Sequence, residues 1–335
     1  MRLENVIALT HGELVNSPFV HTFTNIVFDV KNVKRGDLFI AYDEHSIEDA
    51  IFNGAYGIIF DKPTQISDSE IAWIKVKNLD DALSRLLRFR LIDKDITVYE
   101  CDSITLELAI QLMTDNSFVP LVGGIRQVFP VLNTLEDGAI VLFSPTETTV
   151  DIFTKLNFLP TPQEKSIKIV EKTLFETSFI YENVYYERQL LTPLFIPYLE
   201  KLLYLLVTCK INFRLKKFTP LTHFEAVFVN KRFERKEFGT TEKVVIFEHS
   251  PSLIMQEIVF LQEYASWGTL LLILPESLHE NYAQCDGNFY FYKSQEEIQT
   301  FLRQQTFHFA LVVGVRSSFL DTMIIEKKQL KLFDF

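Results

Sequence analysis

The sequence is poor in the residue types that make disulfide-bonded, membrane-spanning or polyanion-binding proteins. Its three cysteines lie far apart, at positions 101, 209 and 285, which favours reduced thiols in a reducing compartment. No apolar run approaches the ~20 residues that span a bilayer. Lys and Arg number 33 against 44 Asp and Glu, so a net charge of −11 disfavours general nucleic-acid binding. The sequence therefore predicts a cytoplasmic protein with no nucleic-acid partner and no membrane span.

Apolar residues are abundant and follow two alternating patterns. Hydrophobic residues make up 47% of the 335 and phenylalanine alone contributes 31, enough for a large core. Short β-rich runs alternate with helical periodicity, which is typical of an α/β protein. The expected strands are 25–29, 38–41, 57–60, 72–76, 96–100, 139–143, 225–229, 244–247, 269–274 and 309–313. The expected helices are 47–53, 79–89, 104–114, 193–208, 252–264 and 294–305.

Two polar breaks divide this pattern. LIDKD near residue 95 separates an N-terminal unit, and EFGTTEK near residue 240 separates the last strand and helix series. The length also suits two or three domains. We therefore expect domains at 1–95, 96–240 and 241–335.

Several spaced motifs in the first part of the chain resemble one family. The turn Asp29-Val30-Lys31 precedes the run Arg35-Gly36-Asp37-Leu38-Phe39-Ile40-Ala41, and Gly54-Ala55 precedes the apolar run at 57–61. Together these resemble the N-terminal domain of the Mur ligases, most closely the type that adds D-alanyl-D-alanine to the tripeptide. Those enzymes join UDP-N-acetylmuramoyl peptides to further amino acids with ATP. The resemblance implies three α/β units, with a shortened central P-loop-type domain and a Rossmann-like C-terminal domain.

The ATP loop that the resemblance implies lacks the residues that bind phosphate. Residues 96–105, ITVYECDSIT, align with the family's Ile-Thr-Gly-Thr-Asn-Gly-Lys-Thr-Thr-Thr. Val98 and Cys101 stand where glycines belong, and Asp102 stands where the phosphate-binding Lys belongs. Ser103 takes the place of the metal-binding hydroxyl, although a Ser at a helix start is more often an N-cap. A phosphate loop needs backbone amides that close on the anion and a cation beside them, so we expect no cofactor; ATP and magnesium would bind only in an active enzyme.

Other polar positions of the family are also replaced. Segment 144–149, SPTETT, stands where the family has a His-containing metal and substrate motif, and Glu147 there is more often a solvated loop residue than a cation ligand. His223 takes the place of an Arg, Phe247-Glu248 that of an acidic pair, and Val313 that of a Lys. The resemblance thus predicts a fold retained after loss of the ligase reaction, with no catalytic residue.

Six residues remain as substrate-binding candidates under the resemblance, and no metal ligand is expected. The seven histidines are scattered with no i, i+4 pair. Glu248-His249-Ser250 has hydrolytic residue types, but neighbours on a strand point to opposite faces. Gly36-Asp37 is also ordinary turn chemistry. The candidates are Asp29, Lys31, Gly36, Asp37, Arg316 and Ser317.

These features favour a catalytically degenerate Mur-ligase-like protein that acts by binding. It would hold a UDP-linked precursor, or contact cell-wall synthesis proteins as a scaffold or regulator in peptidoglycan precursor synthesis. The alternative is an active ATP-dependent ligase, or another enzyme that uses a repurposed cleft. The charged groups that meet in that cleft discriminate between the two.

Overall fold

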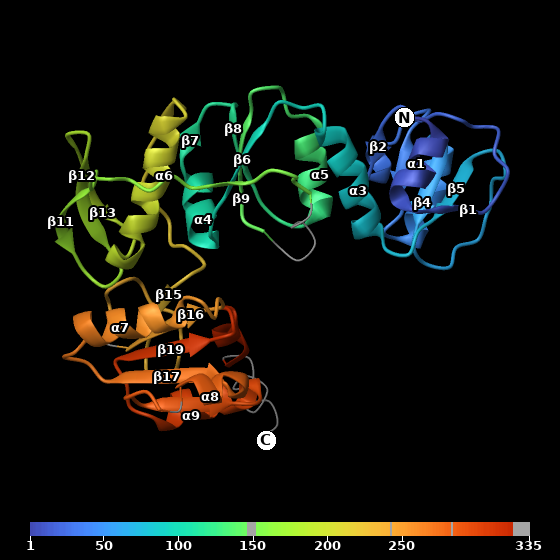
Figure 1. Cartoon of the computed structure of the whole chain (residues 1–335). Helices are drawn as coiled ribbons and strands as arrows, with labels where there is room; N and C mark the ends of the chain where they lie inside the picture. Colours follow the sequence, from blue (N-terminus) through green and yellow to red (C-terminus); the bar gives the residue numbers. More distant parts are fainter. Residues whose placement is uncertain (146–151, 242, 283, 324–335) are drawn as a thin grey trace, which may run out of the picture. The chain divides into compact units, whose positions relative to one another are not determined.

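The structure, a computed structural model, describes residues 1–145, 152–241, 243–282 and 284–323. The chain forms two compact units. Unit 1 holds 1–106, 114–160 and 208–213, and unit 2 holds 107–113, 161–207 and the chain from 214 onward. Both units mix helices with a largest sheet that is mainly parallel (Figure 1), and unit 2 adds a small antiparallel sheet, so the predicted α/β class is confirmed.

The first sheet of unit 1 is built from short apolar runs. Its strand order is β1-β5-β4-β3-β2, with β1 antiparallel to β5 and the others parallel. Every residue of β3 and β4 is buried, as expected where helices cover both faces. The strands are β1 Glu13–Leu14, β2 Ile26–Val27, β3 Leu38–Ile40, β4 Gly57–Phe60 and β5 Ala72–Lys75.

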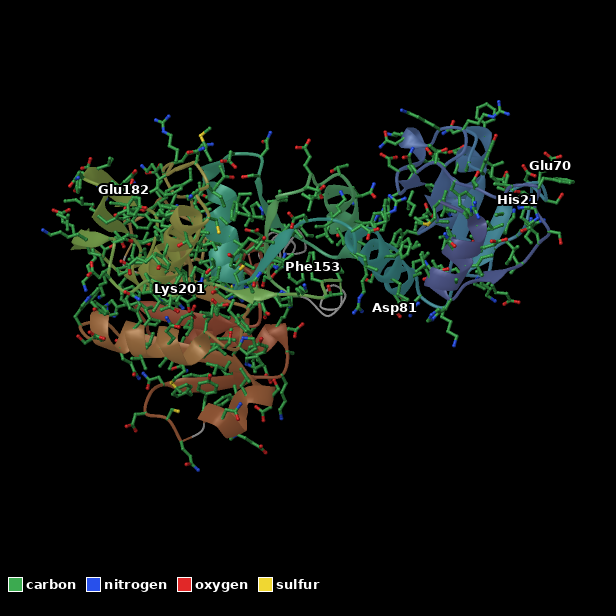
Figure 2. The ribbon with its side chains drawn as sticks, turned by 45° about the horizontal axis from the view of Figure 1, so that its top comes forward. His21, Glu70, Asp81, Phe153, Glu182 and Lys201 are labelled. Carbon is green, nitrogen blue, oxygen red and sulfur yellow. The ribbon has the colours of Figure 1, made fainter. Side chains whose placement is uncertain are left out.

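Helices with polar starts accompany this sheet. Asn78 caps α3 by accepting a hydrogen bond from the Asp81 amide at 3.0 Å, and Asp80 and Asp81 suit the positive end of the helix dipole. Figure 2 shows Asp81 at this first turn. The elements are α1 Leu3–Thr10, α2 Ile47–Phe52, α3 Leu79–Leu91 and the 3₁₀ turns η1 Val30–Asn32 and η2 Glu44–Ser46.

A second, fully parallel sheet completes unit 1. Its order is β10-β6-β9-β8. Short strands β7 (Met113–Thr114) and β14 (Phe213–Arg214) lie where the chain passes between the units. The other elements are β6 Thr97–Glu100, α4 Ser103–Gln111, β8 Phe118–Leu121, α5 Ile125–Asn133, β9 Ile140–Phe143 and β10 Asn157–Phe158.

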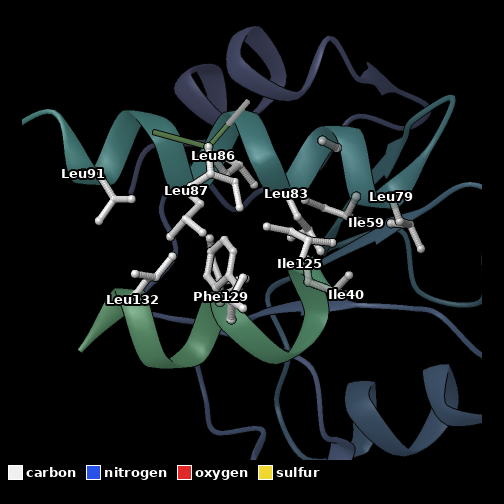
Figure 3. Close-up of a cluster of buried hydrophobic side chains, with 14 of the residues drawn as sticks. Ile40, Ile59, Leu79, Leu83, Leu86, Leu87, Leu91, Ile125, Phe129 and Leu132 are labelled. Atoms are coloured by element: carbon white, nitrogen blue, oxygen red, sulfur yellow. The ribbon is translucent and has the colours of Figure 1, made fainter. Parts of the chain in front are cut away.

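One hydrophobic core joins the two sheets of unit 1. Leu83 and Leu87 on α3 belong to the same buried cluster as Phe129 on α5 (Figure 3). The cluster reaches Ile59 in the first sheet and Val141 in the second. The predicted boundary at residue 95 is therefore crossed by continuous packing, and the division at 95 and 240 stays a prediction.

Unit 2 begins with an antiparallel sheet beside a long helix. Strands β11 (Lys168–Lys172), β12 (Thr177–Tyr181) and β13 (Val184–Gln189) pair in chain order. Glu182 and Asn183 both have positive φ, 48° and 63°, as a two-residue type I′ hairpin turn requires. Figure 2 shows Glu182 on this turn and Lys201 on α6. The 3₁₀ turn η3 (Pro193–Phe195) leads into α6 (Ile196–Thr208).

The last sheet of unit 2 has the order β15-β16-β19-β17-β18. Only β15 is antiparallel to its neighbour. β17 follows β16 in sequence, but β19 lies between them in the sheet. In open α/β sheets, ligands bind at the carboxyl ends of the strands where the strand order changes direction. The elements are β15 Glu225–Val229, β16 Lys243–Glu248, α7 Ile254–Tyr264, β17 Leu270–Pro275, η4 Glu276–Leu278, α8 His279–Tyr282, β18 Phe289–Tyr292, α9 Gln295–Gln304 and β19 Phe309–Val313.

Most predicted elements are present within one or two residues. One end is wrong: the helix expected over 104–114 stops at Gln111, and residues 113–114 form β7. Among the described residues, no helix is long and apolar enough to cross a membrane.

The shared core makes a specific prediction for Leu87→Ala. Leu87 is fully buried in the cluster of Figure 3, so the change should lower the free energy of unfolding by about 2–5 kcal/mol. Hydrogen exchange should quicken in both β4 and β9, because one core supports both sheets. Ile92→Ala, at a 66% exposed position just after α3, is the control and should cost less than about 0.5 kcal/mol. Faster exchange confined to β4 would contradict the continuous core.

Candidate functional site

The segment predicted to be a vestigial phosphate loop is the turn from β6 to α4. Val98 is a buried strand residue, and Cys101 is buried directly after β6. The Cys101 amide donates to the Phe143 carbonyl at 2.9 Å, which holds the turn against β9. Burial, then the charges of Asp102 and Glu100, raise the pKa of the Cys101 thiol. Cys101 is therefore a protonated core residue and no nucleophile.

Asp102 caps helix α4. Its Oδ1 accepts a hydrogen bond from the Thr105 amide at 2.8 Å, and its Oδ2 accepts one from the Thr105 hydroxyl at 3.0 Å. The Leu106 amide donates to the Asp102 carbonyl at 3.1 Å, the first bond of the helix. The expectation that Ser103 is the cap is wrong, because Ser103 is the first residue of α4. A carboxylate of the chain thus bonds the amide that an anion at this helix end would use.

The cap predicts the cost of changing Asp102. Asp102→Ala removes both bonds to Thr105 and should lower the free energy of unfolding by about 1 kcal/mol, within a range of roughly 0.5–2. Asp102→Asn keeps an amide oxygen that caps nearly as well, and it serves as the matched control. Urea denaturation measures both variants. An alanine variant as stable as the wild type would show that the cap contributes nothing.

Gly36 and Asp37 form a buried turn in unit 1. Asp37 is 1% exposed, and its Oδ1 accepts from the backbone and side-chain nitrogens of Asn25 at 3.2 and 3.1 Å. Its Oδ2 accepts from the Lys34 amide at 2.9 Å. Gly36 has φ +95°, and a Cβ there would lie 2.8 Å from the Thr24 hydroxyl. These contacts account for the Gly-Asp pair as a structural turn.

The turn Asp29-Val30-Lys31, which precedes the Gly-Asp pair, is a local helix cap. Asp29 is exposed and accepts from the Lys31 amide at 3.0 Å, which starts η1. Lys31 is exposed as well. A ligand role for Asp29, Lys31, Gly36 and Asp37 stays a prediction. The observed contacts already give Asp29, Gly36 and Asp37 structural roles.

Asp37 and Asp29 give a matched pair of variants. Asp37→Ala leaves the amides of Asn25 and Lys34 without their acceptor and should lower the free energy of unfolding by about 2–3 kcal/mol. Asp29→Ala removes one exposed bond and should cost about 1 kcal/mol or less. Thermal and urea unfolding compare them. Equal costs would contradict a structural role for Asp37.

Arg316 and Ser317 line a hollow in unit 2. It has a volume of about 350 Å³ and lies at the carboxyl ends of β16 and β19. Sequence reasoning selected Arg316 and Ser317 but not the residues that meet them there. The lining residues are Thr222, Glu225, Phe247, His249, Val315, Arg316, Ser317 and Ser318.

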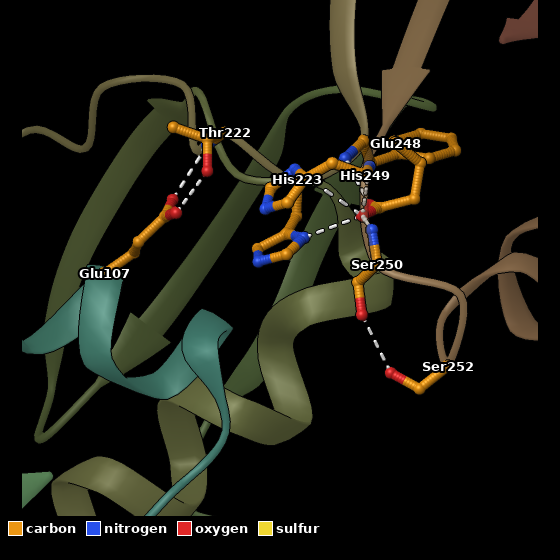
Figure 4. Close-up of polar contacts among 8 residues, drawn as sticks. Glu107, Thr222, His223, Glu248, His249, Ser250 and Ser252 are labelled. Atoms are coloured by element: carbon orange, nitrogen blue, oxygen red, sulfur yellow. Dashed lines mark hydrogen bonds and ion pairs between the residues drawn. The ribbon is translucent and has the colours of Figure 1, made fainter. Parts of the chain in front are cut away.

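A buried polar cluster adjoins this hollow through His249. Glu248 is 0% exposed, and its Oε1 lies 2.9 Å from His223 Nδ1. The amides of His249 and Ser250 donate to Oε1 at 2.8 and 2.6 Å, and the Phe224 amide donates to Oε2 at 3.1 Å. Figure 4 shows these contacts, with the separate pair formed by Glu107 and Thr222. Three backbone amides and one histidine therefore hold the Glu248 carboxylate.

The expectation that Glu248 and His249 point to opposite faces is wrong. β16 ends at Glu248, so the alternation of a strand no longer applies to His249. His249 Nδ1 lies 3.8 Å from Glu248 Oε1, and the His249 ring stacks on the His223 ring with centroids 4.4 Å apart. Ser250 Oγ instead contacts Ser252 Oγ at 2.9 Å. A serine hydrolase triad finds no support in these contacts.

A second buried carboxyl, Glu257 on α7, lies beside Glu248. Glu257 is 0% exposed, and neither oxygen accepts a bond from a donor in the described ranges. Burial, then the neighbouring Glu248, raise the pKa of Glu257 far above its usual range. Burial alone raises the pKa of Glu248, but bonds from His223 and Glu257 outweigh it and leave that pKa well below its usual range. At neutral pH Glu248 is ionised, and Glu257 keeps a proton that it can donate to Glu248.

The remaining predicted positions carry no charge or lie outside the described residues. Val313 is a buried residue of β19. Glu147, with most of segment 144–149, lies outside the described residues.

The fold, with polar residues at the carboxyl ends of β16 and β19, is that of a multi-unit α/β protein and resembles ligases in solved structures. No family model matches the sequence. One crystal structure of MurF from Acinetobacter baumannii superposes with a TM-score of 0.52 at 11% identity, covering 98% of both chains. The UDP-N-acetylmuramoylalanyl-D-glutamyl-2,6-diaminopimelate–D-alanyl-D-alanyl ligase of the same organism gives a TM-score of 0.50 at 12% identity, again over 98% of both.

A sequence relationship supports the same family. The chain is 34% identical over 92 residues to the UDP-N-acetylmuramoyl-L-alanyl-D-glutamate–2,6-diaminopimelate ligase of Clostridium tetani. That stretch covers 25% of this chain and about a fifth (19%) of the ligase. The chain thus resembles the Mur ligases in fold along nearly its whole length and in sequence over these 92 residues.

Proposed function

We propose that this chain is a catalytically degenerate Mur-ligase-like protein that acts in the cytoplasm by binding, in peptidoglycan precursor synthesis. The observation that carries the proposal is the start of α4. There Asp102 places its own carboxylate on the Thr105 amide, at the turn where the resemblance expects a phosphate loop.

The negative charge of Asp102 at that turn opposes the binding of a nucleotide. A triphosphate oxygen ~4 Å from the Asp102 carboxylate would be repelled by about 4 kcal/mol at an effective dielectric of ~20, where a lysine would attract it by as much. Each ~1.4 kcal/mol is a factor of ten in affinity. The side chains of Val98 and Cys101 also replace the glycines that let a loop close on phosphate.

The position where the resemblance expects a Lys, Val313, supports the same proposal. Val313 is buried within β19 and pairs with Glu248 across the sheet, so it offers a ligand no charge. Phosphoryl transfer depends on positioned cations that stabilise the developing charge. Ligands that need no phosphoryl transfer are a UDP-linked precursor or a cell-wall synthesis enzyme, which the protein would hold or regulate.

The alternative is an active ligase, or another enzyme with a repurposed cleft. The hollow at the ends of β16 and β19 favours it, because His249, Arg316 and Ser317 meet there. Both readings keep the Mur ligase relationship, and they differ only in whether turnover occurs.

Turnover separates the two readings. The full chain is incubated with Mg-ATP, UDP-N-acetylmuramoyl peptides and the amino acids or D-alanyl-D-alanine, and phosphate release is followed. We expect release no faster than without peptide, while an active Mur ligase under the same conditions turns over. ATP-dependent formation of an extended muramoyl peptide would overturn the proposal. In that case Arg316→Ala should abolish the product.

A further inference from the structure

Strand register brings two histidines opposite each other at the end of the last sheet. β15 and β16 are antiparallel, and Glu225 pairs with Phe247. Continuing this register by two residues sets His223 opposite His249, which matches the stacked rings 4.4 Å apart. Directly opposed residues on antiparallel strands are close enough for their side chains to meet. Glu248, the last residue of β16, then lies beside both rings.

The donor atoms of these three residues nearly have the spacing of a metal site. One ligand atom from each of His223, Glu248 and His249 lies within 4.8 Å of the others. Tetrahedral zinc with bonds of ~2.0–2.1 Å sets its donors roughly 3.3 Å apart. The distances from Glu248 Oε1 are 2.9 Å to His223 Nδ1 and 3.8 Å to His249 Nδ1. Shifts of about 0.5 Å bring these two distances to the spacing of ligands, and the two imidazoles, whose donor atoms lie within 4.8 Å of each other, have to approach as well.

Orientation is fixed for two ligands and adjustable for the third. The His249 and Ser250 amides hold Glu248 Oε1, and the side chain of His223 is 1% exposed. The His249 side chain is 40% exposed, so its ring has room to turn out of the stack toward a shared metal. Hydrogen bonds to a ligating carboxylate orient it and are a regular part of metal sites.

Glu257 adds a second, independent observation. It lies on α7, is 0% exposed, and its two oxygens accept no bond from donors in the described part of the chain. Buried carboxylates are ordinarily paired or bound to metals, because an unpaired one is costly to desolvate. A divalent cation beside Glu248 would offset the charge of that carboxylate, and Glu257 would lie beside the pair as a further oxygen group.

We propose that His223, Glu248 and His249 form a binding site for a first-row divalent cation, with zinc as the expected occupant, and that Glu257 supports it from α7. A donor set of two imidazoles and one carboxylate suits first-row transition metals and zinc, whereas Mg²⁺ and Ca²⁺ take oxygen ligands. His249 also lines the hollow of about 350 Å³ that contains Thr222 and Arg316. A fourth coordination position is therefore reachable by water or a small anion from that side.

Cobalt is the probe that tests the site. The tag-free full chain is stripped with EDTA, dialysed and titrated with Co²⁺, whose visible absorption reports tetrahedral nitrogen and oxygen ligands; Zn²⁺ is then added in competition. We expect one Co²⁺ per chain with visible bands that Zn²⁺ abolishes. Absence of bands in the wild type would overturn the proposal whatever the variants do.

Two histidine variants separate this site from adventitious binding. His249→Ala removes the half-exposed ligand and should weaken Co²⁺ binding at least tenfold. His279→Ala removes an exposed histidine elsewhere in unit 2 and should leave the titration unchanged. Circular dichroism of the stripped proteins checks that both variants fold. Equal titrations for the two variants would mean that surface histidines bind the metal, and would overturn the proposal.

Discussion

The carboxylate of Asp102 at the start of α4 is the constraint on which the functional account depends. A helix N-terminus attracts negative charge, and in this chain the Asp102 side chain supplies that charge. The same bond stabilises α4, so the feature that disfavours a nucleotide also supports the fold. Under the proposed function, the aspartate that caps α4 is also the residue that replaces the cation of a phosphate loop.

The parts of the fold that follow from local pattern were predictable. Strands β4 and β19 match their predicted bounds, because continuous apolar runs between polar turns define buried parallel strands. The antiparallel strand β15 also has its predicted bounds. Helix α5 was not predicted, since Pro130 lies inside it and Pro normally ends a helix. Strand β11, exposed at every residue, lacks an apolar face and so gave no alternation. Packing of α3 against α5 depends on contacts between distant segments, which no local pattern contains.

The candidate site was predictable only in part, for a similar reason. Asp37 and Asp102 were found by motif, although their observed contacts are structural. His223 and His249 are 26 positions apart, and only the register of β15 against β16 sets them face to face. Glu257 comes from a helix beyond that strand pair. The one available signal is the polar run Glu248-His249-Ser250 at the end of an apolar strand. Extending strand alternation to His249, which follows the strand, gives that side chain the wrong direction.

Calorimetric titration of the full chain with Mg-ATP tests the central claim most directly. An active Mur ligase titrated under the same conditions shows that the nucleotide and the method are sound. Because Asp102 occupies the start of α4, the account predicts no saturable heat up to about 1 mM nucleotide, a level that would reveal even a binding free energy near −4 kcal/mol. Saturable binding at micromolar concentration would contradict it, and would mean that this chain binds nucleotide without the glycines and lysine of the family loop.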